Sequence, residues 1–511
     1  MFGVNAPLTG RKALAGMPTQ AWSSSRRAGH SWVGTAGVVL LFLAAGVFLG
    51  LVATTGSALY VSIAAAMILG PLLLARPAWV MWLVLVLGLT VSGVLPIWAE
   101  GAASRSVWGI SGLAFLLFVL AVFKVISTPG LGRQTPMFIW LFLAFAAYAI
   151  VNAIAQSPTL YQGTSGVKRY LQAYGVMFAL AWLTWSDVDI RRWRVLFLVV
   201  ALAQLPWAIY ERLQLVPIRE GMAQFYPGMV PIDVVAGTFG SQIIAGGASG
   251  EMAWFIIVVL VFLLARWQFG ALSGPRLCGL GLLVVSPLFL GETKVVLLLL
   301  PLAVLVLYRT TIFRRPLVAL SILTLSAALT FGALMAYLTY SEKSIAQQLQ
   351  ETVRYNFGEQ GYGVYKLNRT SVLTFWASKQ GLDDPAGLMF GHGTGSSHDP
   401  TGGDVSRRYP GFGIGFTSAS AMLWEQGVLG TLLLLAAFVA AWRCAGRLQL
   451  QAEVGWLRAD AAAIQTAVFL AAGFYIYAGS PTSTLTYQLV VASIFGYLAW
   501  LHRRYRQPAP T

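Results

Sequence analysis

The stretch SGEMAWFIIVVLVFLLAR, residues 249–266, places a long apolar run between one glutamate near its start and one arginine at its end. An α-helix of roughly 20 apolar residues spans the hydrocarbon core of a bilayer, which is about 30 Å thick. A helix also satisfies its own backbone hydrogen-bonding groups, which lipid cannot do. This stretch therefore predicts a membrane-spanning helix.

Similar apolar runs recur along the whole chain. Of its 511 residues, 57% are hydrophobic and only 10% are charged, against about 25% charged residues in an ordinary soluble domain. The sequence predicts an all-α polytopic membrane protein with about 14 transmembrane helices. The predicted helices cover residues 32–53, 57–75, 79–97, 107–126, 137–155, 170–186, 194–211, 249–266, 277–291, 294–308, 316–338, 423–442, 462–479 and 486–501.

The net charge is +16, and the basic and acidic residues are predicted to lie mostly on opposite sides of the membrane. If the N-terminus is inside, most lysines and arginines fall in cytoplasmic segments and most acidic residues fall outside. This asymmetry follows the positive-inside rule, and it predicts that both termini are cytoplasmic. The charge is therefore a topology signal, and we expect no nucleic-acid partner. The basic clusters include Arg11, Lys12, Arg26, Arg27, Arg191, Arg192, Arg194, Arg309, Arg314, Arg315, Arg503, Arg504 and Arg506.

This topology divides the chain into five segments. They are a basic cytoplasmic tail (1–31), eleven helices (32–338), a large outer loop (339–422), three helices (423–501) and a second cytoplasmic tail (502–511). Loops of this length are usually functional or disordered, and the aromatic residues of this loop favour order. Residues 369–382 have helical spacing, which predicts a short helix on the membrane surface or over a cavity.

The sequence GHGTGSSHDPTGGD, residues 391–404, is a glycine-dense turn near the end of the outer loop. Successive glycines let backbone amides point at an anion, as in phosphate-binding nests, although a flexible connection would have the same composition. His392 and His398 lie close to Asp399 and Asp404 and could hold a metal ion. An exposed loop without metal is the favoured interpretation.

Six basic residues face the outer side by this topology: Lys168, Arg169, Arg212, Arg219, Lys294 and Arg369. For Lys168 and Arg212, the simplest interpretation is a long side chain that reaches from a helix end to the interface. Lys294 differs, because Glu292 and Lys294 interrupt an apolar stretch between residues 277 and 308. Ionised groups at such depth usually pair, line water or take part in function. The break predicts two short half-helices that meet at a cavity, where cations suit a phosphate-bearing ligand.

Five stretches occur in a fixed order: GTFG (237–240), the charged break at 291–294, NRTSVLTFWASK (368–379), MFGHGTGSS (389–397) and SAMLWEQGVLGTLLLL (420–435). Together they resemble the bacterial O-antigen ligase and polysaccharide polymerase superfamily of integral membrane glycosyltransferases. In that superfamily a large periplasmic loop ends in a Gly-x-Gly-x-Gly-type turn, which matches Gly391, Gly393 and Gly395. A helix with a glutamate and two glycines follows, which matches Glu425, Gly427 and Gly430. The resemblance covers about residues 130–500.

The resemblance implies inverting transfer of a glycan from an undecaprenyl-diphosphate carrier to an acceptor sugar hydroxyl, on the periplasmic face of the bacterial inner membrane. It implies no metal and no cofactor, because basic side chains hold the departing diphosphate. Membrane lipids, the lipid-linked glycan, a flippase and chain-length or export proteins are the expected partners.

The site residues are expected on the same ground. By position, Arg369 matches the family's loop arginine, and Lys294 stands where relatives often carry Ser-Arg. Catalytic roles are expected for Arg369, Lys294, Glu292, His392 and His398, and diphosphate binding for Lys294, Arg369, Arg212, Arg219, Lys168 and Arg169.

The sequence departs from the family in two places. Many ligases carry a His-Asn pair shortly before the conserved glutamate, where this chain reads FTS (416–418). His392, His398 or Glu425 could replace that histidine, or the reaction could proceed without such a base. GTFG is followed by SQ (241–242) rather than by Pro-Asn.

Three functions stay open, and the missing histidine favours the first of them. This is a polymerase of exopolysaccharide or O-antigen repeats, and a ligase to lipid A-core or protein is the alternative. A flippase of lipid-linked sugars is the third. The flippase would carry charge deep in several helices, whereas the charge here gathers on the outer side.

Overall fold

The computed structural model describes residues 76–226, 229–244, 246–291, 294–314 and 367–506, with scattered positions between 43 and 75 and between 317 and 356. The chain forms two compact units, Met1–Ala75 and Arg76–Thr511. In the first unit, the described positions from 43 to 50 are helical.

The second unit is helical apart from one short hairpin among its described residues. Its first elements are α3 (Pro77–Val86), η1 (Leu87–Val91), α4 (Ser92–Val94), η2 (Leu95–Ile97), α5 (Glu100–Ser127), α6 (Leu131–Gln134), α7 (Met137–Gln156), α8 (Leu160–Leu171), α9 (Tyr174–Trp182), α10 (Asp187–Tyr210), η3 (Glu211–Leu215) and α11 (Val216–Met222).

The elements of the second half continue along the chain. They are η4 (Pro231–Val234), η5 (Gly237–Phe239), β1 (Ser241–Gln242), β2 (Gly246–Gly247), α12 (Ser249–Gln268), α13 (Gly274–Val285), η6 (Ser286–Phe289), α14 (Val296–Arg314), α17 (Ser371–Gln380), α18 (Pro385–Phe390), η7 (Asp399–Thr401), α19 (Asp404–Arg408), α20 (Ser418–Gln451), α21 (Gly455–Tyr477), η8 (Ser480–Thr482) and α22 (Leu485–Arg506). β1 and β2 pair antiparallel, with Ser241 opposite Gly247.

Eight helices of the described residues are long and apolar enough to cross a membrane. They are Pro77–Ile97, Arg105–Ser127, Met137–Gln156, Asp187–Met222, Ser249–Gln268, Ser418–Gln451, Gly455–Tyr477 and Leu485–Tyr505. The predicted helical membrane architecture agrees with this finding. Most positions of the predicted helices 32–53, 57–75 and 316–338 lie outside the described residues.

The predicted helix 170–186 is wrong as a single span. α8 ends at Leu171, and α9 contains only nine residues, too few to cross a bilayer core. At the break, the side-chain amide of Gln172 donates a hydrogen bond to the Ser483 carbonyl (2.9 Å). All nine residues of α9 are buried, and the helix contacts α5 and α22. Its apolar sequence therefore reflects burial within the protein.

The predicted break in the apolar stretch 277–308 is present. η6 ends at Phe289 and α14 begins at Val296, so two short apolar helices flank the break. Gly291 is buried, and a Cβ there would lie 3.1 Å from the Val235 carbonyl oxygen. The break therefore packs against the segment before η5. Lys294 is partly buried in the turn, and Glu292 lies outside the described residues.

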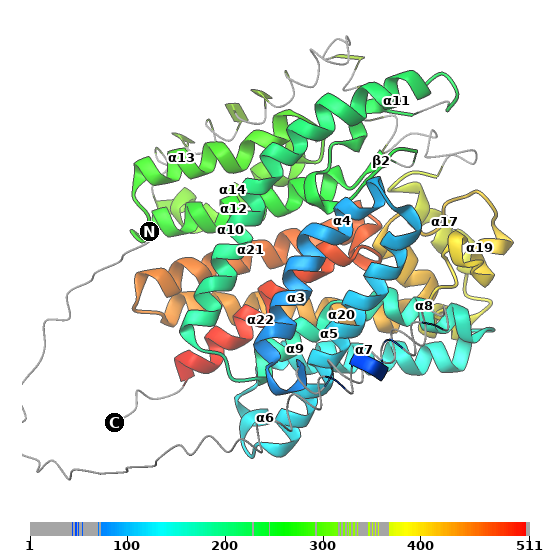
Figure 1. The fold of residues 1–511 in the computed structure, drawn as a ribbon, viewed down its shortest axis with the longest axis horizontal. Helices are drawn as coiled ribbons and strands as arrows, with labels where there is room; N and C mark the ends of the chain where they lie inside the picture. The colour runs from blue at the N-terminus through cyan, green and yellow to red at the C-terminus, as the bar shows by residue number, and fades with distance from the viewer. Residues whose placement is uncertain are drawn as a thin grey trace, which may run out of the picture. The chain divides into compact units, whose positions relative to one another are not determined.

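α22 lies at the centre of the described bundle. It is the least apolar of the eight long helices but the most buried. In its apolar stretch 94% of the residues are buried inside the protein, against 28% for the helix from Arg105 to Ser127. Its buried polar residues include Thr486, Gln488 and Ser493. Polar residues of membrane helices turn towards the protein interior, and α22 accordingly contacts α9, α20 and α21 (Figure 1).

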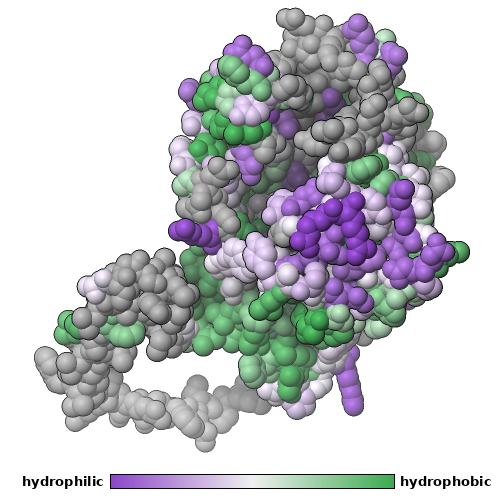
Figure 2. All heavy atoms as spheres, turned by 90° about the vertical axis from the view of Figure 1, so that its right-hand side faces the viewer, coloured by the Kyte–Doolittle hydropathy of each residue, from purple (hydrophilic) through white to green (hydrophobic). Residues whose placement is uncertain are grey.

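The polar segments gather at one end of the bundle, on the right of Figure 1, where α8, α17 and α19 lie with α11 and β2. We call it the loop end. Gly250, at the start of α12, lies against Phe474 near the end of α21, so both halves of the chain reach this end. Figure 2 faces it and shows a hydrophilic patch bordered by hydrophobic residues. Exposed charged residues at this end include Lys379, Asp383, Asp384, Arg407 and Arg408.

At the opposite end, a fully buried carboxylate binds two arginines. Asp460 of α21 accepts hydrogen bonds from Arg194 of α10 (2.9 Å) and from both Nε and Nη2 of Arg266 of α12 (2.9 and 3.0 Å). The Tyr497 hydroxyl of α22 donates a fourth (2.6 Å). This Asp460 cluster joins four helices that are distant in sequence.

The predicted orientation can be tested by cysteine labelling. Leu382, between α17 and α18, is 80% exposed, and Leu450, near the end of α20, is 83% exposed. We propose single cysteines at these positions after both native cysteines, Cys278 and Cys444, are replaced by serine. In cells with a permeabilised outer membrane, an impermeant thiol reagent should label Leu382→Cys. It should label Leu450→Cys only after the inner membrane is broken. The reverse pattern would overturn the orientation.

Candidate functional site

The glycine turn between α18 and η7 requires its three glycines. Gly391, Gly393 and Gly395 have φ angles of 76°, 92° and 80°, in the left-handed region that glycine adopts without steric cost. A Cβ on them would lie 2.5 Å, 3.0 Å and 2.9 Å from the backbone of α20, α7 and α8, respectively. The turn is therefore seated tightly among three helices.

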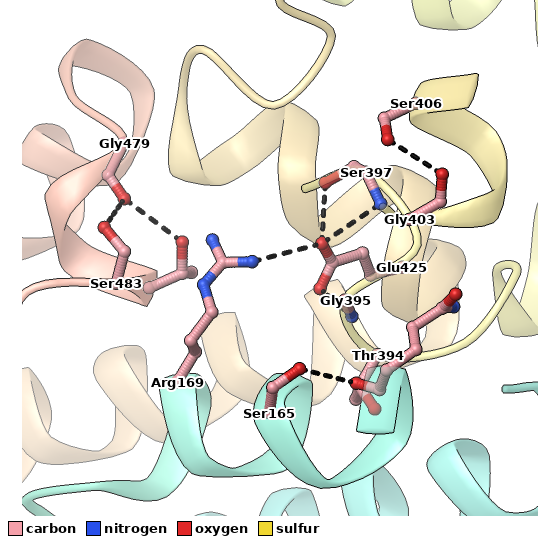
Figure 3. A network of polar contacts seen from close by, with 12 residues as sticks. Ser165, Arg169, Thr394, Gly395, Ser397, Gly403, Ser406, Glu425, Gly479 and Ser483 are labelled. Carbon is pink, nitrogen blue, oxygen red and sulfur yellow. Dashed lines mark hydrogen bonds and ion pairs between the residues drawn. The ribbon is translucent and has the colours of Figure 1, made fainter. Parts of the chain in front are cut away.

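Glu425 of α20 holds this turn in place through hydrogen bonds. Its carboxylate is fully buried and accepts hydrogen bonds from the Gly395 N–H (2.8 Å), the Ser397 hydroxyl (2.6 Å) and the Ser397 N–H (3.3 Å). Arg169 Nη1 lies 3.8 Å from Oε1 of the same carboxylate. Figure 3 shows Glu425 between the turn and the Arg169 guanidinium. Both carboxylate oxygens are occupied by these contacts, so Glu425 holds the turn in position. This argues against Glu425 as the base that takes the proton of the acceptor hydroxyl.

The second residue of the family-like signature, Gly427, breaks the geometry of α20. Its φ and ψ angles are 66° and −170°, within a helix that continues on both sides. The carbonyls freed by this kink are satisfied from other segments, because the His392 N–H donates to Trp424 (2.9 Å) and the Tyr148 hydroxyl to Gln426 (2.7 Å). The third residue, Gly430, leaves room for the Tyr148 ring. The signature thus shapes the seat of the glycine turn.

Arg169 reaches this site from the last turn of α8, and Lys168 precedes it in the same turn. Thr159 caps the start of this helix by accepting from the Gln162 N–H. Lys168 Nζ lies 5.1 Å from the centre of the Trp108 ring, within range of a cation–π contact. Burial, and then the neighbouring charge of Arg169, lower the pKa of Lys168 to about 8. Lys168 is therefore mostly charged at pH 7.

The two histidines of the turn have different surroundings. His392 shares a hydrogen bond with the Gln380 side chain (2.8 Å), and burial lowers its pKa. Burial and the charge of Arg169 lower the pKa of His398 to about 4, which places His398 in the field of that arginine. Within the described ranges, no group of three or more His, Cys, Asp or Glu side chains could hold a metal ion, so nothing in them favours the metal alternative.

Arg369, just before α17, binds the end of α21. Its Nε donates to the Tyr477 carbonyl (2.8 Å) and its Nη1 to the Asn356 side chain (2.8 Å). Its guanidinium also lies 4.2 Å from the centre of the Tyr477 ring and 5.4 Å from that of Phe416. The helical spacing predicted for 369–382 corresponds to α17. These contacts orient the guanidinium and hold the start of α17 on the bundle.

Arg169 and Arg369 flank the same connection between α21 and α22. Arg369 binds the Tyr477 carbonyl directly before this connection. The Arg169 carbonyl accepts a hydrogen bond from Gln488 (2.7 Å), which also donates to the Pro481 carbonyl within the connection (3.0 Å). Arg169 is thus brought together with Glu425 and the glycine turn, and Arg369 binds the residue that precedes the connection.

Arg212 and Arg219 belong to a different cluster, around the GTFG segment. Arg219 is 2% exposed, and its guanidinium donates to the carbonyls of Gln242 (3.1 Å) and Val230 (3.0 Å). Arg212 lies in η3, and Lys294 lies in the break that packs beside Val235. The contacts of Arg219 hold the loop together, and its role in diphosphate binding stays a prediction.

Two residues that the sequence analysis missed hold the GTFG segment. Glu211, fully buried in η3, accepts from the N–H groups of Ala236 (2.9 Å) and Gly237 (2.7 Å) and from the Ser241 hydroxyl. Gln204 accepts from the Thr238 N–H (2.9 Å). Glu211 and Glu425 therefore do the same work, since each binds two backbone amides and one serine hydroxyl of a glycine-containing loop. The sequence feature that could have identified Glu211 is its position directly after an apolar run, where an ionised group is costly.

No known family model matches this chain, and no curated protein matches it. The likeness to the ligase and polymerase superfamily therefore rests on the five stretches of sequence and stays a prediction.

Proposed function

We propose that this protein polymerises lipid-linked glycan repeats. We propose as its reaction site the group formed by Glu425, Arg169 and the glycine turn at the loop end, which we call the Glu425 cluster. The observation that supports this proposal most is that the Arg169 guanidinium is mostly buried but has hydrogen-bond donors that are not used. Its side chain is 15% exposed, and its distance to Glu425 is long, at 3.8 Å. Its Nε and Nη1 are buried and have no hydrogen-bond partner among the described residues. A guanidinium with spare donors suits the oxygens of a diphosphate.

The proposed reaction is an inverting glycosyl transfer. A hydroxyl oxygen of the acceptor sugar attacks the anomeric carbon of the donor glycan from the face opposite to the diphosphate. The new carbon–oxygen bond forms as the bond to the phosphate oxygen breaks, and its electron pair leaves with undecaprenyl diphosphate. Charge develops on this leaving group, so preorganised cations lower the barrier. We assign this role to Arg169 and Lys168, with Arg369 as a third cation that binds the Tyr477 carbonyl directly before the α21–α22 connection.

His398 is the candidate that best fits the role of base for the acceptor hydroxyl. Its pKa is lowered to about 4 by burial and by Arg169, so its imidazole is neutral, and can take a proton, at any pH well above 4. Burial and Arg169 also lower the pKa of Lys168 to about 8, so its charge is lost as the pH rises through 8.

The two pKa values predict the pH profile of chain extension. The rate should stay level between about pH 4 and about pH 8. At lower pH the rate should fall because His398 gains a proton, and at higher pH it should fall because Lys168 loses one. A rate that halves near pH 6.5, the pKa of an ordinary histidine, would contradict the role of His398. Lys168→Arg should move the alkaline fall to higher pH and leave the acid side unchanged, which serves as the internal control.

A strain that lacks the protein tests the proposed function against its alternatives. Loss of a polymerase should leave single repeats on undecaprenyl diphosphate at the periplasmic face. Loss of a ligase would instead leave long glycans on the carrier, and loss of a flippase would leave single repeats facing the cytoplasm. We expect the first result, and either of the others would overturn the proposal.

A further inference from the structure

A cavity of about 360 Å³ lies at the end of the molecule opposite to the loop end. It is open on one side and is lined by residues at the end of α5 and just after it, in α6, at the end of α9 and just after it, and in the last turns of α22. Its walls include the rings of Trp182, Trp185 and Trp500, and its basic residues are Lys124, Arg503 and Arg504. The distance from the start of α22, near the Glu425 cluster, to Arg503 is about 27 Å at a rise of 1.5 Å per residue. The cavity is therefore separate from the proposed reaction site.

The charge of the cavity is positive. Its described lining residues include no acid. Asp187 neutralises one of the three cations, since it forms an ion pair with Arg504 (2.5 Å). Arg503 donates from Nη2 to the Leu183 carbonyl (3.1 Å), while its Nε is buried and has no partner within the described part of the chain. Lys124 is exposed at the edge. Two cations that Asp187 does not neutralise, Lys124 and Arg503, therefore line the same cavity, and Arg503 has one guanidinium donor that is not used.

The aromatic walls of the cavity are apolar surfaces. The Trp182 indole N–H donates to the Thr135 hydroxyl (3.0 Å), and that of Trp185 donates to the Ala179 carbonyl (2.8 Å). These polar edges are thus satisfied within the protein. Tryptophan rings are frequent at the level of lipid headgroups, where one side is apolar and the other wet.

The mouth of the cavity borders a surface suited to lipid chains. Phe123 and Ile126, which flank Lys124 on α5, are 68% and 77% exposed. Met137, at the start of α7, is 64% exposed. A ligand that places an anion between Lys124 and Arg503 would therefore have apolar protein surface beside it.

We infer that this cavity binds the phosphate of an anionic phospholipid headgroup, with the acyl chains lying along α5 near Phe123 and Ile126. Phosphate oxygens match the ammonium of Lys124 and the guanidinium of Arg503. Basic pockets between membrane helices recognise anionic headgroups in this way. Free inorganic phosphate has the same chemistry at its oxygens, but it would not use the exposed apolar residues at the mouth. The inference does not depend on the proposed glycosyl transfer.

The test uses the purified full-length protein in a neutral detergent. Retention of added phosphatidylglycerol and phosphatidylcholine is measured by native mass spectrometry, and the thermal midpoint is measured with each lipid. We expect phosphatidylglycerol to be retained and to raise the midpoint, and phosphatidylcholine, which has no net charge, to do neither. Lys124→Gln/Arg503→Gln should weaken phosphatidylglycerol binding by about 30-fold.

Matched variants keep the result interpretable. Arg191→Gln/Arg192→Gln removes the same charge from exposed positions of α10 at the same end, and its binding should equal that of the wild type. Lys124→Glu changes one exposed side chain, so it tests the cavity even if loss of Arg503 prevents folding. Equal losses in the pocket and control pairs, or undiminished binding by Lys124→Glu, would overturn the inference. So would displacement of the lipid by inorganic phosphate alone, which would indicate a site for the free ion.

Discussion

Replacing Asp460 by alanine should lower the free energy of unfolding by about 3–5 kcal/mol, because it leaves two partly buried arginines without their shared counter-ion. The Asp460 carboxylate is fully buried, whereas the side chains of Arg194 and Arg266 are 33% and 30% exposed. Alanine removes all four hydrogen bonds to Asp460, which leaves only the hydrogen bond from Arg194 to the Tyr497 hydroxyl (3.1 Å) to join α10 and α22 at this point. Asp460→Asn preserves the shape and should have a smaller effect.

Asp404 provides a matched control for this prediction. It also pairs with two arginines, Arg407 (3.5 Å) and Arg408 (2.7 Å), but its side chain is 37% exposed and theirs are 62% and 58% exposed. Exposed ion pairs contribute about 0–1 kcal/mol, so Asp404→Ala should be nearly neutral. Unfolding by a denaturing detergent in mixed micelles measures both free energies. Equal effects of the two substitutions would show that the Asp460 cluster does not stabilise the fold as described.

Replacing Arg169 by alanine should lower the rate of chain extension by about 30- to 1000-fold, the equivalent of 2–4 kcal/mol for a lost transition-state contact. Glu425 retains its three hydrogen bonds to Gly395 and Ser397 without this arginine, so the variant should still fold. Arg169→Lys keeps the charge but loses the two-pronged contact with phosphate oxygens. Its rate should lie between those of the wild type and Arg169→Ala.

The control separates catalysis from structure. Arg407→Ala removes one arginine that is 62% exposed at the loop end, and it should extend chains at the wild-type rate. Rates and thermal midpoints are measured on the same purified samples. A folded Arg169→Ala protein with a near-normal rate would make Arg169 a structural partner of Glu425 and would exclude it from the reaction site.

Apolar length predicts the long helices well but does not distinguish lipid from protein surroundings. The predicted span 249–266 corresponds to Ser249–Gln268, because one charge-free run determines the whole element. The predicted span 170–186 failed because the end of α8 depends on a hydrogen bond from Gln172 to Ser483, more than 300 residues away. No local pattern carries that information.

The components of the candidate site could be predicted from the sequence, but their arrangement could not. The glycine turn, Glu425 and Arg169 were each singled out by residue type and position. Their contact results from three glycines that let the turn approach α20, α7 and α8. Asp460 and Glu211 were missed, because a single acidic residue at a helix end gives no indication of whether it meets water or an arginine.

The most direct measurement is the length of glycan that the purified protein makes when undecaprenyl-diphosphate-linked repeats are its only substrate. The account predicts chains of several repeats together with released undecaprenyl diphosphate, formed by the wild type and not by Arg169→Ala. Repeats that stay single, or that are transferred only after lipid A-core is added, would contradict it.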